Sequence, residues 1–319
     1  MTSSRFAFPP SDQAIFLTDG GLETALVYLD GIDLPCFAAF PLLRSKEGRA
    51  RLETYFAPFI RTAVERDVGF ILDTPTWRAN PEWAAKLGVS CDDLMEINRE
   101  AVRWAARLRD RLSDRPERIL INGAIGPRGD GYRVDARMTA EEAQAYHALQ
   151  VEAFRDAGAD MVSAVTMNYA EEAVGIARAA EALGMPVVVS FTVETDGRLA
   201  SGESLPSAIE RTDRETGHTP AYYMINCAHP THFDEILDGN GWWTRRIRGL
   251  RANASAKSHA ELDEATELDP GDPIDLAQRY KDLRRRIPHL SVLGGCCGTD
   301  HRHIAAICET CLPELGRAA

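Results

Sequence analysis

Eight short apolar segments, separated by longer amphipathic stretches, constrain the fold of this 319-residue chain more than any other feature. Most of the segments are continuous apolar runs, which is the pattern of parallel strands buried on both faces. Regular alternation of such strands with helices predicts an α/β protein with a single (β/α)8 (TIM) barrel, because a doubly wound sheet would not normally need eight evenly distributed strands. The predicted strands are Ile15–Asp19, Gly69–Asp73, Ile119–Gly123, Met161–Val165, Val187–Thr192, Ala221–Cys227, Ile247–Ala252 and Leu290–Gly295.

The stretches between the strands carry helix signals. One helix is predicted to begin at a capping box formed by Thr139 and Glu142. Its predicted buried stripe consists of Ala143, Tyr146, Leu149 and Ala153. No linker divides the chain, so residues 1–319 are expected to form one barrel domain. The acidic, proline-containing stretch of about residues 253–275 follows the seventh strand and is predicted to be a loop over the active face.

Composition excludes several classes of function. The net charge is −12, so binding of nucleic acid or anionic lipid would need a local basic patch, and the one dense basic run, Arg284–Arg286, is expected to be a solvated helix end. No apolar run is long enough to span a bilayer, and residues 1–12 lack the apolar segment of an export signal. We therefore expect a cytoplasmic protein whose seven cysteines are reduced thiols.

Three cysteines fall at the carboxyl ends of predicted strands, where the catalytic groups of such barrels lie. Cys227 ends the sixth strand, and Cys296 and Cys297 follow the eighth. Three thiolates that converge there would bind zinc and leave a fourth position open, as in a catalytic site. The flanking glycines would let the two adjacent cysteines turn toward one metal. On pattern alone, the alternative that these are buried small hydrophobes stays open.

Other possible ligands fit a packing role better. Cys308 and Cys311 form a C-x-x-C that would complete a four-cysteine site with the Cys296–Cys297 pair, but they lie on an apolar helical stripe. Cys36 and Cys91 are expected to pack as small hydrophobes. Four histidines lie close to the cysteine motifs but beyond the strand ends; they are His229, His232, His301 and His303.

Several catalytic motifs are absent from the sequence. It contains no G-x-G-x-x-G fingerprint, no P-loop and no G-x-S-x-G elbow, which argues against dinucleotide binding and against an α/β-hydrolase. Gly20 and Gly21, which follow Asp19 at the end of the first strand, would instead allow the backbone to approach a substrate closely.

The two cysteine motifs resemble those of the homocysteine S-methyltransferase family. The stretch Gly294–Thr299 is similar to the family's C-terminal zinc motif, and Ile225–Cys227 is similar to its Asn-Cys motif. Three further stretches follow in family order, so the resemblance covers nearly the whole chain. These stretches are Thr18–Gly21 with Glu23-Thr24, Asp73–Thr76, and Gly126-Pro127 with Gly129-Asp130.

The resemblance implies zinc-dependent transfer of a methyl group to a small-molecule thiol, with homocysteine converted to methionine. Zinc would be held by Cys227, Cys296 and Cys297 and would take the acceptor sulfur as its fourth ligand. The short length fits family members that use a sulfonium donor, S-methylmethionine or S-adenosylmethionine. Partners are thus small molecules, with no nucleic acid and no membrane. The implied substrate-binding residues are Asp19, Gly20, Glu23, Thr74 and Asn226.

One position departs from the family pattern. The family usually places a glutamate for the amino group of homocysteine at the end of the fourth strand, where this chain has Val165. Either another carboxylate substitutes, with Glu23, Glu171 and Glu194 as candidates, or the acceptor is a different thiol. Two alternatives follow: a zinc- or thiol-binding barrel without methyl transfer, and a hydrolase whose zinc activates water. An all-cysteine ligand set disfavours the hydrolase because thiolates lower the Lewis acidity of the metal.

Overall fold

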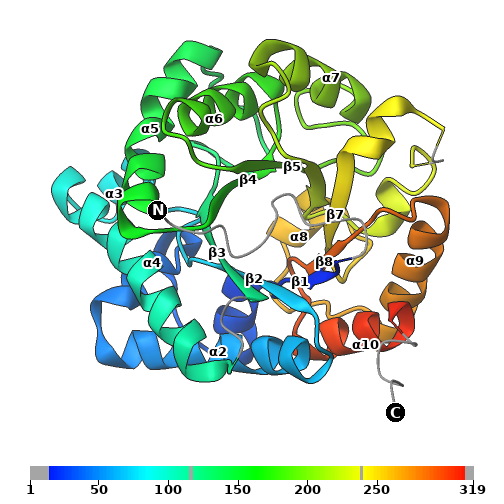
Figure 1. The fold of residues 1–319 in the computed structure, drawn as a ribbon, viewed down its shortest axis with the longest axis horizontal. Helices are drawn as coiled ribbons and strands as arrows, with labels where there is room; N and C mark the ends of the chain where they lie inside the picture. Colours follow the sequence, from blue (N-terminus) through cyan, green and yellow to red (C-terminus); the bar gives the residue numbers. More distant parts are fainter. Residues whose placement is uncertain (1–13, 115–117, 238–239, 313–319) are drawn as a thin grey trace.

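The computed structural model describes residues 14–114, 118–237 and 240–312 and shows a closed barrel of eight parallel strands in the order β1 to β8. The strands form the central ring in Figure 1, and the helices surround it. This confirms the predicted (β/α)8 fold. The strands are β1 (Phe16–Leu17), β2 (Gly69–Asp73), β3 (Ile119–Ile125), β4 (Met161–Met167), β5 (Val187–Phe191), β6 (Tyr223–Asn226), β7 (Ile247–Ala252) and β8 (Val292–Gly295).

Seven longer helices pack on the outside of the ring. They are α2 (Lys46–Glu65), α4 (Cys91–Leu112), α5 (Ala140–Ala157), α6 (Ala170–Ala182), α7 (Leu205–Thr216), α9 (Pro273–Arg286) and α10 (His301–Cys311). Shorter helices, α1 (Leu22–Thr24), α3 (Pro81–Lys86) and α8 (His259–Asp263), follow β1, β2 and β7. No described helix is long and apolar enough to cross a bilayer.

The predicted start of α5 is confirmed, but its buried stripe is different. Thr139 and Glu142 form the capping box. Leu149 is 42% exposed, whereas His147 and Gln150 are buried in its place. His147 bonds Glu172, and Gln150 donates to Asn98. Hydrogen-bonded polar side chains therefore occupy part of the face that the apolar pattern assigned to the core.

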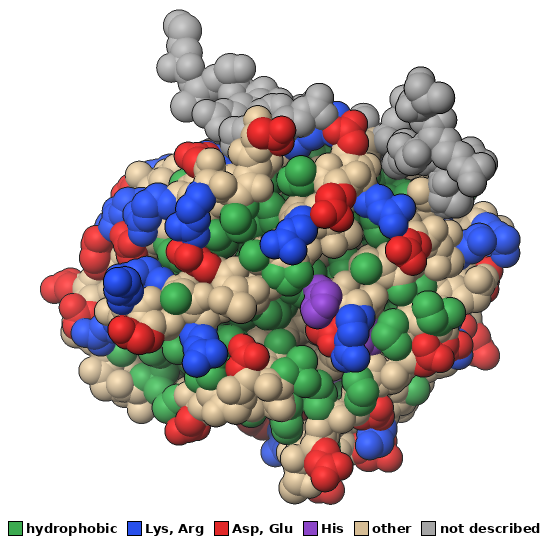
Figure 2. All heavy atoms as spheres, turned by 90° about the horizontal axis from the view of Figure 1, so that it is seen from below, with side chains coloured by type: hydrophobic (Ala, Val, Ile, Leu, Met, Phe, Trp, Pro, Cys, Tyr) green, Lys and Arg blue, Asp and Glu red, His purple; other side chains and the backbone are tan. Residues whose placement is uncertain are grey.

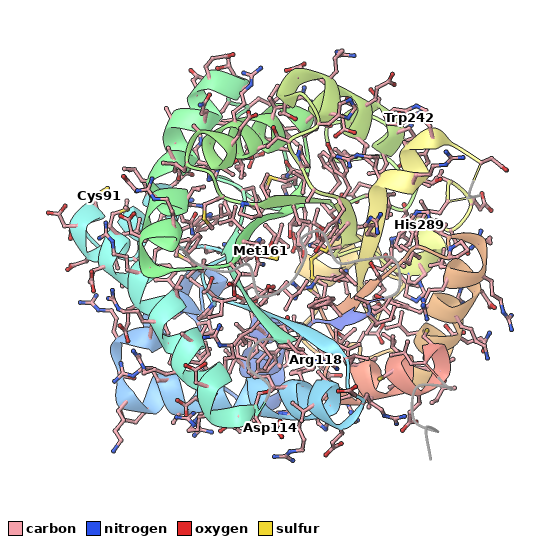
Figure 3. The ribbon with its side chains drawn as sticks, in the orientation of Figure 1. Cys91, Asp114, Arg118, Met161, Trp242 and His289 are labelled. Atoms are coloured by element: carbon pink, nitrogen blue, oxygen red, sulfur yellow. A yellow bond between two sulfur atoms is a disulfide. The ribbon has the colours of Figure 1, made fainter. Side chains whose placement is uncertain are left out.

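The barrel interior is divided into two layers by the alternation of side chains along each strand. The lower layer is a separate apolar cluster made of Phe16, Ile71, Leu120, Met161, Val188, Tyr222, Met224 and Val292. Figure 3 shows Met161 in the middle of the ring, while Cys91 and Trp242 lie at the periphery. The upper layer lies two residues further along the strands, and in six of them its side chain is polar and buried. These residues are Thr18, Asp73, Asn122, Ser163, Ser190 and Asn226.

Charge is spread over the outer surface. Figure 2 shows acidic and basic side chains interspersed on one face, where the described residues form no concentrated basic patch. The Arg284–Arg286 run ends α9 as predicted. Arg285 pairs with Asp282 at 3.0 Å, an exposed contact that contributes little to stability.

Candidate functional site

A cavity of about 360 Å³ opens at the carboxyl ends of the strands. Most of the residues singled out from the sequence line it. They are Asp19, Gly20, Glu23, Thr74, Cys227, Cys296 and Cys297. Asn226 lies beneath the lining and is fully buried. Part of the opposite wall comes from residues 255–269, including Ser255, Leu262, Asp263 and Leu268, so the stretch after β7 does cover this face, although it contains the short helix α8.

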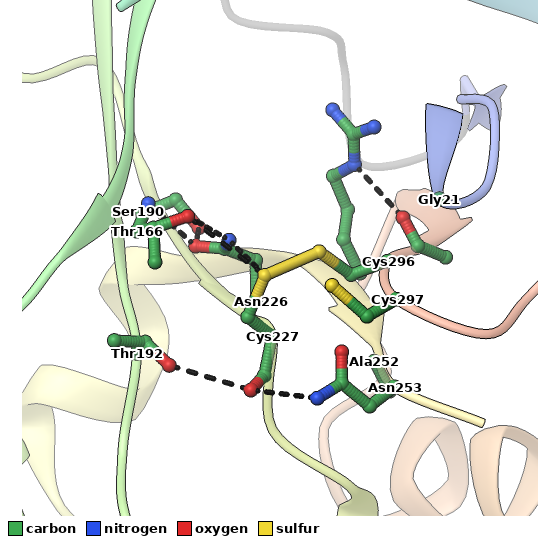
Figure 4. Close-up of a disulfide and its surroundings, with 12 residues drawn as sticks. Gly21, Thr166, Ser190, Thr192, Asn226, Cys227, Ala252, Asn253, Cys296 and Cys297 are labelled. Carbon is green, nitrogen blue, oxygen red and sulfur yellow. Dashed lines mark hydrogen bonds between the residues drawn. A yellow bond between two sulfur atoms is a disulfide. The ribbon is translucent and has the colours of Figure 1, made fainter. Parts of the chain in front are cut away.

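The sulfur atoms of Cys227, Cys296 and Cys297 lie within 4.8 Å of one another. Cys227 follows β6 and the other two follow β8, as predicted. Cys227 and Cys296 are joined in a disulfide, with their Cα atoms 5.3 Å apart (Figure 4). This differs from the expectation that all seven cysteines are reduced. The physical reason is that two strand ends hold these thiols at the Cα separation at which disulfides form.

The backbone at Cys227 is held in an unusual conformation by neighbouring groups. Its φ is +54°, in the left-handed region that non-glycine residues rarely adopt. Its carbonyl accepts from Asn253 Nδ2 at 3.0 Å and its amide donates to the Arg251 carbonyl at 3.1 Å. Asn226 Nδ2 donates to the Cys227 sulfur at 3.2 Å (Figure 4). Asn226 thus positions a cysteine instead of lining the cavity.

Glycines let the two adjacent cysteines turn toward the same point, as expected. Gly298 has a φ of +80°. A Cβ at Gly21 would lie 2.7 Å from the Cys296 carbonyl oxygen and 3.0 Å from Cys297 Cα, so any side chain there would push this turn away. Burial raises the pKa of the Cys297 thiol to about 11.

Asp19, Asp73 and Arg251 form a buried ion cluster beside the cysteines. Arg251 Nη2 lies 2.6 Å from Asp19 Oδ1, and Arg251 Nη1 donates to Asp73 Oδ2. Tyr55 donates to the second oxygen of Asp19 at 3.1 Å. Burial raises the pKa of Asp19 to about 7, although Arg251 opposes the shift. Both carboxylate oxygens of Asp19 therefore already have protein partners.

The two other predicted contact residues have different environments. The Thr74 hydroxyl contacts Thr76 Oγ1 at 2.6 Å and accepts from the amide of Ala124 at 3.1 Å, so it holds the β2 end against β3. Glu23 lines the cavity, and no described residue forms a side-chain hydrogen bond or ion pair with its carboxylate. Burial raises the pKa of Glu23 to about 7.

Sequence reasoning missed a chain of contacts on the other side of the cysteines. The Tyr132 hydroxyl lies 3.5 Å from Cys297 Sγ, and its ring stacks on His259 with centroids 4.1 Å apart. His259 contacts Glu194 at 2.8 Å and also bonds the Cys227 carbonyl. Burial opposes ionisation of His259, but the bonds to Glu194 and the Cys227 carbonyl, together with the charges of Glu194 and Asp263, raise its pKa. These residues lie in loops after different strands, which no local motif connects. Arg251 did carry a signal, because it is a charged residue near the carboxyl end of a predicted strand.

The remaining cysteines and histidines lie outside the sulfur cluster. Cys308 is fully buried in α10 and Cys311 packs against the core, which confirms the packing interpretation. Cys36 is half-buried and Cys91 is exposed, so Cys91 is not the packed small hydrophobe that was expected, because it lies on the exposed first turn of α4. Three of the four histidines have hydrogen-bond partners away from the sulfur atoms: His229 with Thr231, His232 with the Ala256 carbonyl, and His303 with Asp300 and the Pro270 carbonyl. His301 is exposed on the first turn of α10.

Comparisons with known proteins agree with this geometry. Residues 16–311 match the family model described as homocysteine S-methyltransferase. A homocysteine S-methyltransferase from Escherichia coli (strain K12) is 29% identical over 146 residues, which are 43% of this chain and 47% of that protein. The aligned part thus spans about half the length of that relative.

Solved structures show the same fold. The homocysteine methyltransferase MmuM from Escherichia coli in its oxidized form has a TM-score of 0.75 at 21% identity, covering 95% of this chain and 97% of that chain. Its metallated form has a TM-score of 0.72 at 21% identity, covering 92% and 96%.

Proposed function

The chain belongs to the homocysteine S-methyltransferase family, and on that premise we propose that it transfers a methyl group from a sulfonium donor to the sulfur of homocysteine, giving methionine. The reaction is assigned to one barrel domain spanning residues 1–319. S-methylmethionine or S-adenosylmethionine would serve as the donor. The observation that carries the proposal is the convergence of three cysteine sulfurs within 4.8 Å at the mouth of a cavity.

The donor set fits zinc once Cys227 and Cys296 are reduced. Cys227, Cys296 and Cys297 would hold the metal through three thiolates and leave it able to take a further sulfur ligand, and soft ligands of this kind suit zinc. The bond from Asn226 to the Cys227 sulfur is the kind of outer contact that orients a metal ligand. The similarly folded MmuM also has a metallated form, which supports a metal here. When bound, zinc would keep the acceptor sulfur as a thiolate near neutral pH.

The methyl transfer itself needs little acid–base catalysis from the protein. A bond forms between the acceptor sulfur and the methyl carbon while the carbon–sulfonium bond breaks and returns its electron pair to the donor sulfur. The acceptor thiol proton leaves to solvent. The chain's task is to hold both substrates in line and to exclude water, which the walls formed by Val165, Leu262 and Leu268 serve.

Three carboxylates could replace the family's glutamate that is missing at Val165, and of these Glu23 is the best placed to bind the acceptor's ammonium group. Glu194 is bonded to His259, and Glu171 is paired with Arg211 at 3.0 Å. Glu23 lines the cavity without such a partner among the described residues. Asp19 and Gly20 then hold the same end of the acceptor from the floor of the cavity.

Cobalt(II) substitution tests the proposal, because thiolate-to-cobalt absorption reports the ligands. Under reducing conditions, the protein should show tetrahedral cobalt bands that change on titration with L-homocysteine, and methionine should form when S-methylmethionine or S-adenosylmethionine is added. Cys297→Ala should lose both signals, whereas Cys91→Ala, which alters an exposed cysteine, should keep both. Cobalt bands that do not respond to homocysteine would favour another acceptor. Absence of cobalt binding by the reduced wild type would reject the metal site.

A further inference from the structure

Two arginines line the cavity, and their surroundings differ sharply. Each of the three guanidinium nitrogens of Arg251 already has a protein partner, namely Asp19, Asp73 and the Gly295 carbonyl. Arg78 makes one hydrogen bond, from Nη1 to the Cys36 carbonyl at 2.8 Å. Its Nε is buried and has no hydrogen-bond partner. The carboxylates of Asp130 and Glu23 attract Arg78 electrostatically, but none of the described residues forms an ion pair with it at contact distance. A guanidinium in this state retains unused donors at the wall of a binding cavity.

Arg78 is held in place by aromatic rings. Its guanidinium carbon lies 3.8 Å from the ring centroid of Trp83 and 4.8 Å from that of Trp77, which also lines the cavity. Cation–π contacts fix the plane of a guanidinium and leave the donors on its edge available. Because the group is held before any ligand arrives, a ligand loses less free energy to ordering it.

The other charges in the cavity restrict what Arg78 can bind. Only Arg78 and Arg251 supply positive charge among the lining residues. The acidic lining residues are Asp19, Glu23, Asp73, Asp130, Asp263, Glu267 and Asp269. A multiply charged anion such as a phosphate ester would be repelled by this excess of carboxylates. A zwitterion brings its own ammonium, and its single carboxylate matches the two-pronged donor geometry of a guanidinium.

We propose that Arg78 is a specificity-determining residue that binds the α-carboxylate of an amino-acid substrate at the cavity wall. The inference rests on the proposed function, and Glu23 is the matching group for the α-ammonium. Acceptor and donor both carry an α-carboxylate, so the shared chemistry is a zwitterionic α-amino acid. Arg251 is poorly suited to this role because Asp19 and Asp73 already neutralise its charge.

A cycle of ligand and protein changes tests the proposal by calorimetry, without turnover. L-methionine, which contains the α-amino-acid end, is compared with 3-(methylthio)propylamine, which lacks the carboxylate. Loss of the carboxylate should weaken binding to the wild type on the order of 10- to 100-fold, as expected for a charge-assisted hydrogen bond. In Arg78→Gln the two ligands should bind within roughly 3-fold of each other, because the partner of the carboxylate is gone.

Two further variants control for fold and charge. Arg137→Gln removes an arginine that stacks on Tyr169 at 6.0 Å outside the lining and should keep the wild-type preference. Arg78→Lys keeps the charge without the fork and should restore part of the preference, so it also serves if Arg78→Gln does not fold. If folded Arg78→Gln or folded Arg78→Lys kept the full wild-type preference for L-methionine over 3-(methylthio)propylamine, the proposal would be overturned.

Kinetics then distinguish which substrate presents the carboxylate. If Arg78 holds the acceptor, KM for homocysteine should rise in Arg78→Gln while KM for the donor stays unchanged; if it holds the donor, the reverse is expected. No change in either KM would contradict the assignment. A protein that binds L-methionine with the predicted preference but methylates no thiol would reject the proposed function while leaving the Arg78 inference intact.

Discussion

The lower and upper layers of the barrel interior are built from the same strands but differ in chemistry. The lower layer is apolar and closely packed. Strand β7 contributes only Gly249 at this level, where a Cβ would lie 2.6 Å from Met224 Cγ. The upper layer, two residues later, is polar: Asn122 donates to Asp73 at 2.7 Å, and Ser190 donates to Asn226 at 2.6 Å. The lower layer is thus held by apolar packing, while the upper layer is held by polar contacts that position the groups at the mouth.

This division shows how a charge can be buried for function. Arg251 occupies the upper-layer position of β7 and is tolerated there because Asp19 and Asp73 neutralise it. Buried ion pairs contribute little net stability, but removal of one partner is costly. Substitution of one member of the upper-layer ion cluster therefore leaves its partners without a counter-charge, whereas the effect of a substitution in the lower layer depends on the side-chain volume that is removed.

The largest effect on stability is expected from Arg251→Met, which breaks the upper layer. Two carboxylates would remain buried without a cation, so the free energy of unfolding should fall by about 3–5 kcal/mol. Urea unfolding near pH 8 measures it. Arg103→Met, which removes exposed ion pairs on α4, should cost less than about 1 kcal/mol. If the free energy of unfolding fell by an equal, small amount in both variants, the ion cluster of the upper layer would behave like an exposed surface pair, which would contradict the comparison.

A smaller effect is expected from Met161→Ala in the lower layer. The cavity left by this buried side chain should lower the free energy of unfolding by about 2–4 kcal/mol. Because Met161 belongs to the layer below the mouth, the cobalt spectrum and its response to L-homocysteine should stay as in the wild type. Leu149→Ala, at an exposed position of α5, should change the free energy by less than about 0.5 kcal/mol. An altered cobalt spectrum in Met161→Ala would show that the layers are coupled.

The two layers also differ in how much the sequence predicts. All eight strands were identified, because continuous apolar runs such as Val187–Phe191 signal buried parallel strands directly. The cysteine cluster was predicted because a closed barrel brings the carboxyl ends of its strands to one side. Both inferences need only local patterns and the symmetry of the fold.

The contacts between loops could not be predicted in the same way. Tyr132 reaches Cys297 from 165 positions away, and His259 reaches Glu194 from 65 positions away. Such pairs depend on the length and conformation of each loop after its strand, which residue type does not determine. Asn226 illustrates the same limit, since its motif was recognised but its bonds run to Thr166, Ser190 and the Cys227 sulfur, beneath the cavity lining.

The smallest predicted effect concerns Glu23, which lies in the mouth and, unlike Asp19, forms no contact ion pair with any described residue. Burial raises its folded-state pKa to about 7, above its ordinary value of 4.5. Ionisation therefore costs more in the folded state than in the unfolded state, and the stability linked to this group is present below about pH 4.5 and is lost as pH rises to about 7. The free energy of unfolding of Glu23→Gln, relative to that of the wild type, should be about 1–2 kcal/mol higher at pH 8 than at pH 5. Each pH unit between the two pKa values corresponds to roughly 1.4 kcal/mol, and partial exposure reduces the effect. Urea unfolding of the metal-free proteins at the two pH values measures this margin, with Glu96→Gln on the exposed face of α4 as the control. A margin that is zero, or that favours pH 5, would mean that Glu23 already has a partner in the folded protein and is not free to meet an ammonium group.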